Sequence, residues 1–285
     1  MELINKIKQM KERSDELRRQ GKKIGFVPTM GALHEGHLSL MRQAKLKNDV
    51  VIISIFVNPI QFVEGEDYQT YPKDFTCDVE LAKKTGVDII FYPEVEEMYP
   101  DKPLTFVNVE KLTRGLCGKF RPGHFQGVTT VVTKLFNIVN PHTAYFGQKD
   151  YQQALVVKRM IKDLNFDIEF VIMPIVRDKD GLALSSRNAY LSKEERKSAL
   201  ILYKSLHLAK KILDSGERLS RNIILAMQEL IQTEKLATIQ YIEIVDSKTL
   251  EPVELIEKEV LIALAVKIGK TRLIDNIVTI HPVGK

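Results

Sequence analysis

Short apolar runs recur along the first part of the chain. They occupy residues 24–27, 50–57, 87–91, 144–146 and 168–173, and several of them are continuous rather than alternating. Continuous apolar runs are typical of strands that helices cover on both faces of a parallel sheet. The pattern therefore predicts a Rossmann-like, doubly wound α/β domain.

Helical periodicity fills the stretches between these strands. Residues 1–20 are amphipathic, apolar positions follow the first strand at 38, 41 and 44, and a further helix ends in a cap at Gly86. Residues 128–139 are rich in β-branched side chains, which favour strands, but their apolar positions repeat with a helical period. We give the period more weight and predict a helix there, followed by another helix after Tyr151.

The pattern changes near Pro174. A hairpin is predicted around Asp180-Gly181, and Ser192 with Glu195 forms a capping box for a helix that continues through residue 213. A second helix at 223–231 and three strand-like runs at 241–245, 260–266 and 272–277 follow. We therefore predict two domains, a Rossmann-like domain at 1–175 and a small α+β domain at 176–285.

Composition narrows the class of protein. The 285 residues are 44% hydrophobic and 28% charged, an ordinary globular balance. The net charge of +5 suits an anionic small substrate as well as nucleic acid, but basic clusters with interleaved aromatic residues are missing, so no nucleic-acid partner is expected. Two cysteines, Cys77 and Cys117, indicate a reducing compartment, and the longest apolar run is too short to span a membrane. We expect a cytoplasmic protein without a membrane partner.

Two histidines lie between the first strand and its helix. Gly31 and Gly36 let the backbone approach a ligand there, and a helix start near His37 would offer N–H groups to phosphate. His34 and His37 could then hold phosphate oxygens as charge builds on them. A pair of surface histidines is the plain alternative. A zinc site is a second one, but the spacing is not His-Glu-x-x-His, and no cysteine or third histidine is near in sequence.

Polar residues also follow later strands of the predicted sheet. Gln61 carries an amide suited to a hydroxyl or carboxylate, although a simple turn is the better interpretation of Asn58-Pro59 before it when no family is considered. Lys149 is a mobile cation for phosphate, or an exposed lysine beside a helix cap. Asp78 could assist a magnesium ion, or could be a carboxylate on a helix surface. The glycine-rich stretch 114–127 is predicted to be an active-site loop.

Several of these segments resemble a known family. Residues 34–37 are similar to the His-x-Gly-His signature of the nucleotidyltransferase superfamily, whose members attack the α-phosphate of a nucleoside triphosphate. The longer string 28–37 resembles the pantothenate synthetase (pantoate–β-alanine ligase) family in particular. Further segments match that family in order, at residues 56–62, 67–72, 121–127, 145–150, 184–188 and 272–276. The resemblance covers essentially the whole chain.

The resemblance implies an ATP-dependent ligase that condenses pantoate with β-alanine through pantoyl adenylate, releasing AMP and pyrophosphate. It implies Mg²⁺ carried with ATP, no dedicated metal ligands, a homodimer, and a small domain that closes over the ATP site. Gln61 and Gln153 would bind pantoate, Gln61 would also border the β-alanine site, and His37 would be the catalytic acid. From the residue types discussed above, we expect His34 and Lys149 to be catalytic as well. The ATP-binding residues it implies are Met30, Gly31, Ala32, Leu33, His34, Glu35, Gly36, His37, Gly147, Gln148, Lys149, Asp150, Val176, Leu184, Ser185, Ser186 and Arg187.

Tyr71, Arg121 and His124 lie in matched segments, but the resemblance gives them no role.

Two alternatives to the ligase remain open at this point. The rival enzyme is a nucleotidyltransferase that leaves the nucleotide on its product, and it would share only the histidine segment. The rival outside enzymes is a nucleic-acid-binding protein, which rests on the net charge alone.

Overall fold

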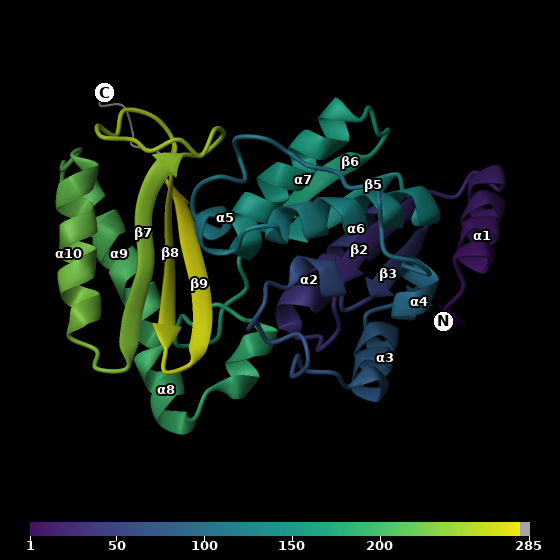
Figure 1. The fold of residues 1–285 in the computed structure, drawn as a ribbon, viewed down its shortest axis with the longest axis horizontal. Coiled ribbons are helices and arrows are strands. Elements are labelled where there is room, and N and C mark those ends of the chain that lie inside the picture. Colours follow the sequence, from purple (N-terminus) through teal and green to yellow (C-terminus); the bar gives the residue numbers. More distant parts are fainter. Residues whose placement is uncertain (280–285) are drawn as a thin grey trace. The chain divides into compact units, whose positions relative to one another are not determined.

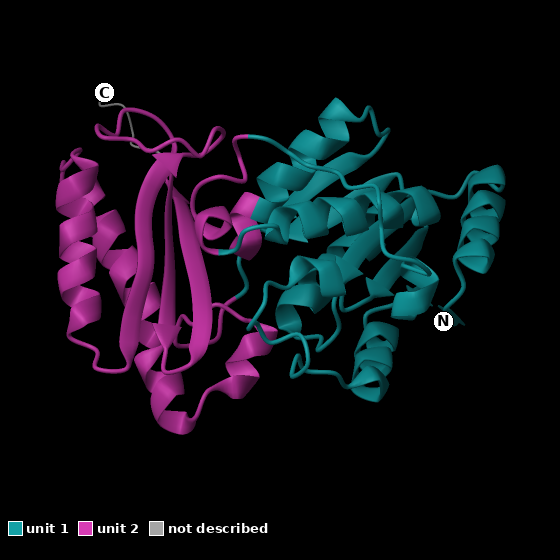
Figure 2. Ribbon diagram, in the orientation of Figure 1, with its two compact units in different colours: residues 1–110, 121–148, 153–176 teal, residues 111–120, 149–152, 177–285 magenta. Residues whose placement is uncertain are grey.

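The structure, a computed structural model, describes residues 1–279 and groups them into two units (Figures 1 and 2). Unit 1 consists of residues 1–110, 121–148 and 153–176, and unit 2 contains 111–120, 149–152 and the chain from 177 onward. The chain thus passes between the units after residues 110, 120, 148, 152 and 176. The predicted division at 175/176 had placed 111–120 and 149–152 in the first domain, whereas both segments group with unit 2.

Unit 1 is built on a six-stranded parallel sheet in the order β1-β4-β3-β2-β5-β6. From β2 the chain continues outward to β3 and β4, and it later returns to place β5 on the other side of β2. Ligands of such sheets bind beyond the carboxyl ends of the strands where the order reverses. The loops that follow β2, β3 and β5 leave the sheet at this edge. The strands are β1 (Glu2–Ile4), β2 (Ile24–Thr29), β3 (Val50–Ile55), β4 (Ile89–Phe91), β5 (Thr143–Gly147) and β6 (Glu169–Met173).

Helices cover both faces of this sheet, which confirms the predicted fold class (Figure 1). On one face, Met41 and Ala44 of α2 (Glu35–Lys47) and Ala82 of α3 (Phe75–Lys84) join a core with Val27 and Ile53. On the other face, Phe26 meets Phe136 of α6 edge to face, with ring centroids 6.4 Å apart. That second layer consists of α1 (Ile7–Arg19), α6 (His124–Val139) and α7 (Tyr151–Asp163), and shorter elements are η1 (Pro59–Gln61), α4 (Val95–Met98) and η2 (Gln148–Asp150).

Unit 2 has the predicted small α+β architecture. Its three strands form an antiparallel sheet in chain order. Apolar residues of α9 and α10, among them Leu206, Ile223 and Met227, share a core with Ile262 and Leu264 of β8. The elements are α5 (Cys117–Phe120), η3 (Ser186–Tyr190), α8 (Lys193–Ser198), α9 (Leu200–Asp214), α10 (Ser220–Gln232), β7 (Ala237–Asp246), β8 (Val260–Ile268) and β9 (Thr271–Thr279).

Four local predictions were wrong or incomplete. Residues 2–4 form the edge strand β1 before the predicted amphipathic helix begins at Ile7. The helix predicted after the Ser192 capping box is two helices that meet at Ala199. The stretch predicted as an active-site loop contains α5 and the first turn of α6. The predicted hairpin at Asp180-Gly181 is reduced to a turn with a single bridge between Arg177 and Ala183. Within residues 1–279, no helix has both the length and the apolar character needed to cross a membrane.

Candidate functional site

The N-terminus of α2 is capped by two imidazole rings. The helix begins at Glu35, close to the predicted start near His37, and His34 is its N-cap. The Nδ1 atom of His34 accepts the N–H of Gly36 at 3.2 Å, and the Nδ1 atom of His37 accepts the N–H of His34 at 3.3 Å. A neutral ring that accepts at Nδ1 carries its hydrogen on Nε2. Both histidines therefore present an Nε2–H donor at a helix terminus whose dipole favours anions.

A buried carboxylate holds the loop that leads into this helix. Asp78 on α3 is 2% exposed, and its oxygens accept the N–H groups of Ala32 at 3.0 Å and Leu33 at 2.7 Å. Burial raises the pKa of Asp78, although the two backbone hydrogen bonds oppose this shift. The interpretation of Asp78 as a helix-surface carboxylate is therefore wrong. Its oxygens are committed to the loop that carries the histidines.

The two glycines of the loop lie against protein side chains. Gly31 has φ +83°, and a Cβ there would lie 2.9 Å from Oδ2 of Asp78. A Cβ on Gly36 would lie 2.9 Å from Cε1 of His34, in the capping ring itself. The prediction gave these glycines the purpose of ligand approach. The structure adds a nearer reason, because any side chain at Gly36 would displace the cap.

Gln61 is oriented by its neighbours. Its Oε1 accepts from Nδ2 of Asn58 at 3.0 Å, and its Nε2 donates to Sδ of Met30 at 3.0 Å. Asn58 is 1% exposed and is itself fixed, because the hydroxyl of Tyr99 donates to its Oδ1 at 2.9 Å. These contacts bring together the loops that follow β2 and β3, as predicted from the sheet edge. Asn58 is thus more than the turn residue of the plain interpretation, since its side chain sets which end of the Gln61 amide donates.

Helix α6 touches the backbone beneath Gln61 directly. A Cβ at Gly127 would lie 2.6 Å from Cα and 2.7 Å from N of Gln61. The carbonyl of Gly127 also accepts from Nδ2 of Asn58 at 3.1 Å. Gly127 is therefore a position where only glycine lets the helix and η1 meet.

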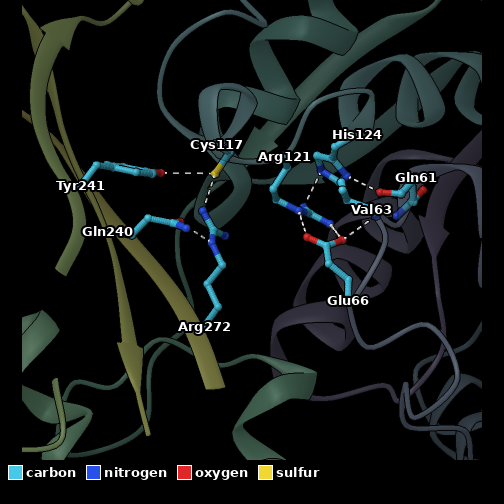
Figure 3. A network of polar contacts seen from close by, with 9 residues as sticks. All are labelled: Gln61, Val63, Glu66, Cys117, Arg121, His124, Gln240, Tyr241 and Arg272. Atoms are coloured by element: carbon cyan, nitrogen blue, oxygen red, sulfur yellow. Dashed lines mark hydrogen bonds and ion pairs between the residues drawn. The ribbon is translucent and has the colours of Figure 1, made fainter. Parts of the chain in front are cut away.

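Gln61 also belongs to a polar network of unit 1 (Figure 3). Nδ1 of His124 lies 2.7 Å from the carbonyl oxygen of Gln61, and Nε2 of the same ring lies 2.8 Å from Nη1 of Arg121. Arg121 binds both oxygens of Glu66, at 2.5 and 2.6 Å, and Glu66 also accepts the N–H of Val63 at 3.1 Å. The sequence had placed Arg121 and His124 in matched segments without a role, and it had not singled out Glu66.

Within unit 2, the segment that carries Lys149 is held by hydrogen bonds from other parts of that unit. Nδ2 of Asn276 donates to the carbonyl of Lys149 at 2.9 Å, and the hydroxyl of Tyr151 donates to the carbonyl of Ser247 at 3.0 Å. The Lys149 side chain is 20% exposed, and its Nζ lies 3.8 Å from Oδ1 of Asp150. The alternative of an exposed lysine is therefore wrong. The contact from Asn276 also gives a structural reason for one of the matched segments near the end of the chain.

The remaining predicted residues lie where their elements place them. Ser185 is the N-cap of η3, and its Oγ accepts the N–H of Arg187 at 3.3 Å, so this hydroxyl has a local partner. A Cβ on Gly147 would meet no protein atom within 4 Å. Gln153 lies half-buried on α7, and its pairing with Gln61 stays a prediction. Glu35 is exposed and pairs with Arg42, whereas Val176, Leu184, Ser186 and Gln148 are half-buried.

Sequence reasoning missed the residues that support the site from a distance. Tyr99 lies 41 positions from Asn58, and Glu66 lies 55 positions from Arg121. Local periodicity gives no signal for contacts of this kind. The one available signal was that Arg121 and His124 lie in a segment shared with a family, without a local reason for their presence.

Comparison with known proteins identifies the family. The family model described as Pantoate-beta-alanine ligase matches residues 2–278. The chain is 60% identical over 278 residues to the pantothenate synthetase of Caldicellulosiruptor bescii, covering 98% of this chain and 99% of that protein. It is 57% identical over 276 residues to the one of Thermotoga neapolitana, covering 97% and 99%.

Solved structures agree with this result. Pantothenate synthetase from Thermus thermophilus matches with a TM-score of 0.92 and 45% identity, covering 97% of this chain and 99% of that one. Pantoate-beta-alanine ligase from Francisella tularensis, complexed with beta-gamma ATP and beta-alanine, matches with a TM-score of 0.80 and 38% identity, covering 100% and 99%. Together with the sheet edge and the histidine-capped helix described above, these matches show that the chain belongs to the pantoate-beta-alanine ligase family, the enzymes that form pantothenate.

Proposed function

We propose that this enzyme joins pantoate to β-alanine in two steps driven by ATP. In the first step, a carboxylate oxygen of pantoate attacks the α-phosphorus of ATP, and the bond to pyrophosphate breaks. In the second, the β-alanine amine attacks the acyl carbon of pantoyl adenylate, AMP leaves with the bonding electron pair, and the amine gives up a proton. Activation is needed because a carboxylate has no adequate leaving group, whereas AMP leaves readily.

The observation that carries the proposal is the arrangement at the carboxyl edge of the parallel sheet. Two imidazoles offer Nε2–H donors at the start of α2, and the Gln61 amide lies against Met30 in the loop before that helix. These three groups lie on neighbouring loops, which supports a shared site for a phosphate and an organic substrate. The Francisella relative, which is complexed with beta-gamma ATP and beta-alanine, supports the same pair of ligands for this chain.

For the triphosphate, we assign His34 and His37 as donors that stabilise charge as pyrophosphate departs. Lys149, as a cation, and Arg187, as a planar fork, are assigned to the phosphates, and the loop 30–37 with Gly147 to Asp150 to the nucleotide. Val176, Leu184, Ser185 and Ser186 complete this assignment. His34, His37 and Lys149 are the proposed catalytic residues.

For pantoate, we assign Gln61 and Gln153. Asn58 engages the oxygen of the Gln61 amide, and the amide nitrogen gives one of its two hydrogens to Sδ of Met30, so the second hydrogen is the donor proposed for pantoate. A donor of fixed direction suits a carboxylate or hydroxyl oxygen of the substrate. β-Alanine is placed next to pantoate at Gln61 in this proposal.

Magnesium is assigned to the nucleotide rather than to a protein cage. Among residues 1–279, no group of three or more His, Cys, Asp or Glu side chains is arranged to hold a metal ion, and Asp78 already accepts two backbone N–H groups. Mg²⁺ is commonly bound through substrate phosphates and water, and there it would neutralise charge on the triphosphate. A homodimer and a cytoplasmic location also belong to this proposal, the latter supported by the free thiols of Cys77 and Cys117.

The experiment that tests the two-step order is pyrophosphate exchange. Labelled pyrophosphate should enter ATP when pantoate is present and β-alanine is absent, because the first step needs only ATP and pantoate. An exchange that strictly requires β-alanine would contradict the order. Product analysis of the complete reaction should find free AMP, and a nucleotide retained on the organic product would instead identify the rival transferase.

A further inference from the structure

We propose that Glu66, Arg121 and His124 are positioning residues that hold the backbone of Gln61 and thereby set the affinity for pantoate. The proposal rests on the assignment of Gln61 to pantoate made above. It adds a device that acts through Gln61, and no contact of these three residues with substrate is required.

The helix η1 cannot hold Gln61 by itself. It is a 3₁₀ helix of three residues, Pro59 to Gln61, and its two closing bonds are long. The N–H of Gln61 lies 3.4 Å from the carbonyl of Asn58, and the N–H of Phe62 lies 3.3 Å from the carbonyl of Pro59. Both distances lie beyond the usual range for strong N–H···O bonds, so the position of Gln61 depends on its surroundings.

Two contacts fix the backbone of Gln61 from the side of α6. Gly127 meets the N and Cα atoms of Gln61 without an intervening side chain, and His124 donates to the carbonyl of Gln61 at 2.7 Å. The side-chain amide is oriented separately, by Asn58 and Met30. Backbone position and amide orientation of Gln61 are therefore controlled by different residues.

The two hydrogen bonds of His124 determine the tautomer of its ring. A carbonyl oxygen only accepts, so Nδ1 of His124 carries the hydrogen toward Gln61. The guanidinium of Arg121 only donates, so Nε2 of His124 accepts from it. The guanidinium thereby locks the tautomer that Gln61 requires, as outer partners do for histidine ligands of metals.

The same network also holds the loop that follows Gln61. Glu66 binds Arg121 through both oxygens and accepts the N–H of Val63, so residues 63–66 are tied to the segment just before α6 (Figure 3). The side chains of Arg121 and Glu66 are only 12% and 22% exposed, so solvent screens this pair little. Gln61 and residues 63–66 are thus held by two residues close in sequence, His124 at the first position of α6 and Arg121 just before that helix.

Two substitutions at His124 each remove one of its two hydrogen bonds and keep the other. In His124→Asn, the amide nitrogen takes the place of Nδ1 and can still donate to the Gln61 carbonyl, but the bond to Arg121 is lost. In His124→Gln, the amide oxygen takes the place of Nε2 and can accept from Arg121, but the bond to Gln61 is lost. Arg121→Lys keeps the charge and loses the fork. Arg159→Lys on the exposed face of α7, where Arg159 pairs with Asp163, is the matched control.

The expected result is a selective loss of pantoate binding. Arg121→Lys and His124→Gln should raise the Kd and KM for pantoate about tenfold, while the KM for ATP changes less than about twofold. His124→Asn should lie closer to the wild type than His124→Gln, and Arg159→Lys should match the wild type. In a double-mutant cycle, Arg121→Lys combined with Gln61→Leu should be clearly less harmful than the product of the two single effects.

Three outcomes would overturn the proposal. One is equal losses for pantoate and ATP in Arg121→Lys and in both His124 variants, which would indicate a general structural role. Another is multiplicative effects in the cycle, which would show that the network does not act through Gln61. The third is full pantoate affinity in His124→Gln, with the variant folded by circular dichroism. Gln61→Leu alone keeps the two proposals apart, because unchanged pantoate affinity in that variant would contradict the assignment of Gln61 itself.

Discussion

In each of the two histidines at the start of α2, one ring nitrogen caps the helix and the other has the proposed role in phosphate binding. In both rings Nδ1 accepts a backbone N–H and completes the helix cap, so Nε2–H is the donor in the proposed contact with a phosphate oxygen. A substitution by alanine removes both functions at once. Substitutions by amides can separate them.

At His37, we expect the donor to matter more than the cap. In His37→Asn, the amide oxygen can accept from the His34 N–H in place of Nδ1, but no donor stands at the position of Nε2. In His37→Gln, the amide nitrogen can stand there. His37→Asn should therefore slow adenylate formation about 10²–10³-fold, the usual effect of losing one preorganised donor, and His37→Gln should be less affected. Single-turnover rates measure this, with amide formation from supplied pantoyl adenylate as the control step. A rescue by Asn rather than Gln would mean that His37 serves the helix and not the phosphate.

Gly147 allows a test of whether a glycine is present for a ligand. A Cβ there meets no protein atom within 4 Å, and its φ is not in the left-handed region. Gly147→Ala should therefore leave the free energy of unfolding unchanged or raise it by less than about 1 kcal/mol. If a phosphate approaches this backbone, the added methyl group should raise the KM for ATP about tenfold. Calorimetry and steady-state kinetics on the same variant decide this. An unchanged KM for ATP would remove Gly147 from the nucleotide site.

At the scale of elements, the loop between β3 and α3 is held by an ion pair with Arg121, in the segment just before α6. Burial alone would raise the pKa of Glu66, but the hydrogen bonds and charge of Arg121 outweigh it, so the pKa of Glu66 lies below its ordinary value. Folding therefore favours the ionised form. The stabilisation is present above the ordinary glutamate pKa and is lost as the pH falls through the lowered one.

Glu66→Gln should show this dependence directly. At pH 7 we expect it to lower the free energy of unfolding by about 1–2 kcal/mol, because one charged partner of a partly shielded pair is lost. The difference from the wild type should shrink as the pH falls below the ordinary glutamate value. Urea unfolding at several pH values measures this, with Asp163→Asn on the exposed face of α7 as the control. A difference that stays constant with pH would show that Arg121 does not stabilise the carboxylate.

The elements were predictable where one local signal was strong. Continuous apolar runs gave five strands of the parallel sheet, and the Ser192–Glu195 capping box marked the start of α8. The strand β1 was missed because it has three residues at a sheet edge, too few for any period. The start of α6 was missed because Gly123, its N-cap, has no side chain to signal a helix.

The candidate site was predictable only in part, for a related reason. Residues that follow a strand, such as His37 and Gln61, can be placed at the sheet edge from sequence alone. The residues that orient them come from distant segments, as Tyr99 does for Asn58 and Asp78 does for Leu33. Their partners are chosen by three-dimensional packing, and no spacing in a single sequence encodes it.

At the scale of the whole molecule, the path of the chain links the stabilities of the two units. The chain passes from one unit to the other after residues 110, 120, 148, 152 and 176, so neither unit is a continuous piece of sequence. Unfolding unit 2 therefore releases residues 111–120 and 149–152, the segments that connect the three parts of unit 1 along the chain. We expect a single cooperative unfolding transition for both units.

Asp275→Asn tests this coupling. Asp275 is 3% exposed and binds Arg177 through both oxygens, at 2.6 and 2.9 Å, within unit 2. Breaking such a buried pair should cost about 3 kcal/mol. In hydrogen exchange, peptides from β8 in unit 2 and from β2 in unit 1 should lose the same protection free energy. Loss confined to β8 would show that the units unfold independently.

The direct meeting of α6 and η1 at Gly127 also limits how the enzyme could be redesigned. Engineers usually enlarge a binding site by trimming the side chains behind it. Where α6 meets Gln61 at Gly127 there is no side chain to trim, because main chain lies on main chain at that point. Acceptance of a bulkier hydroxy acid would have to come from other walls of the site, or from shortening Gln61 itself at the loss of its amide.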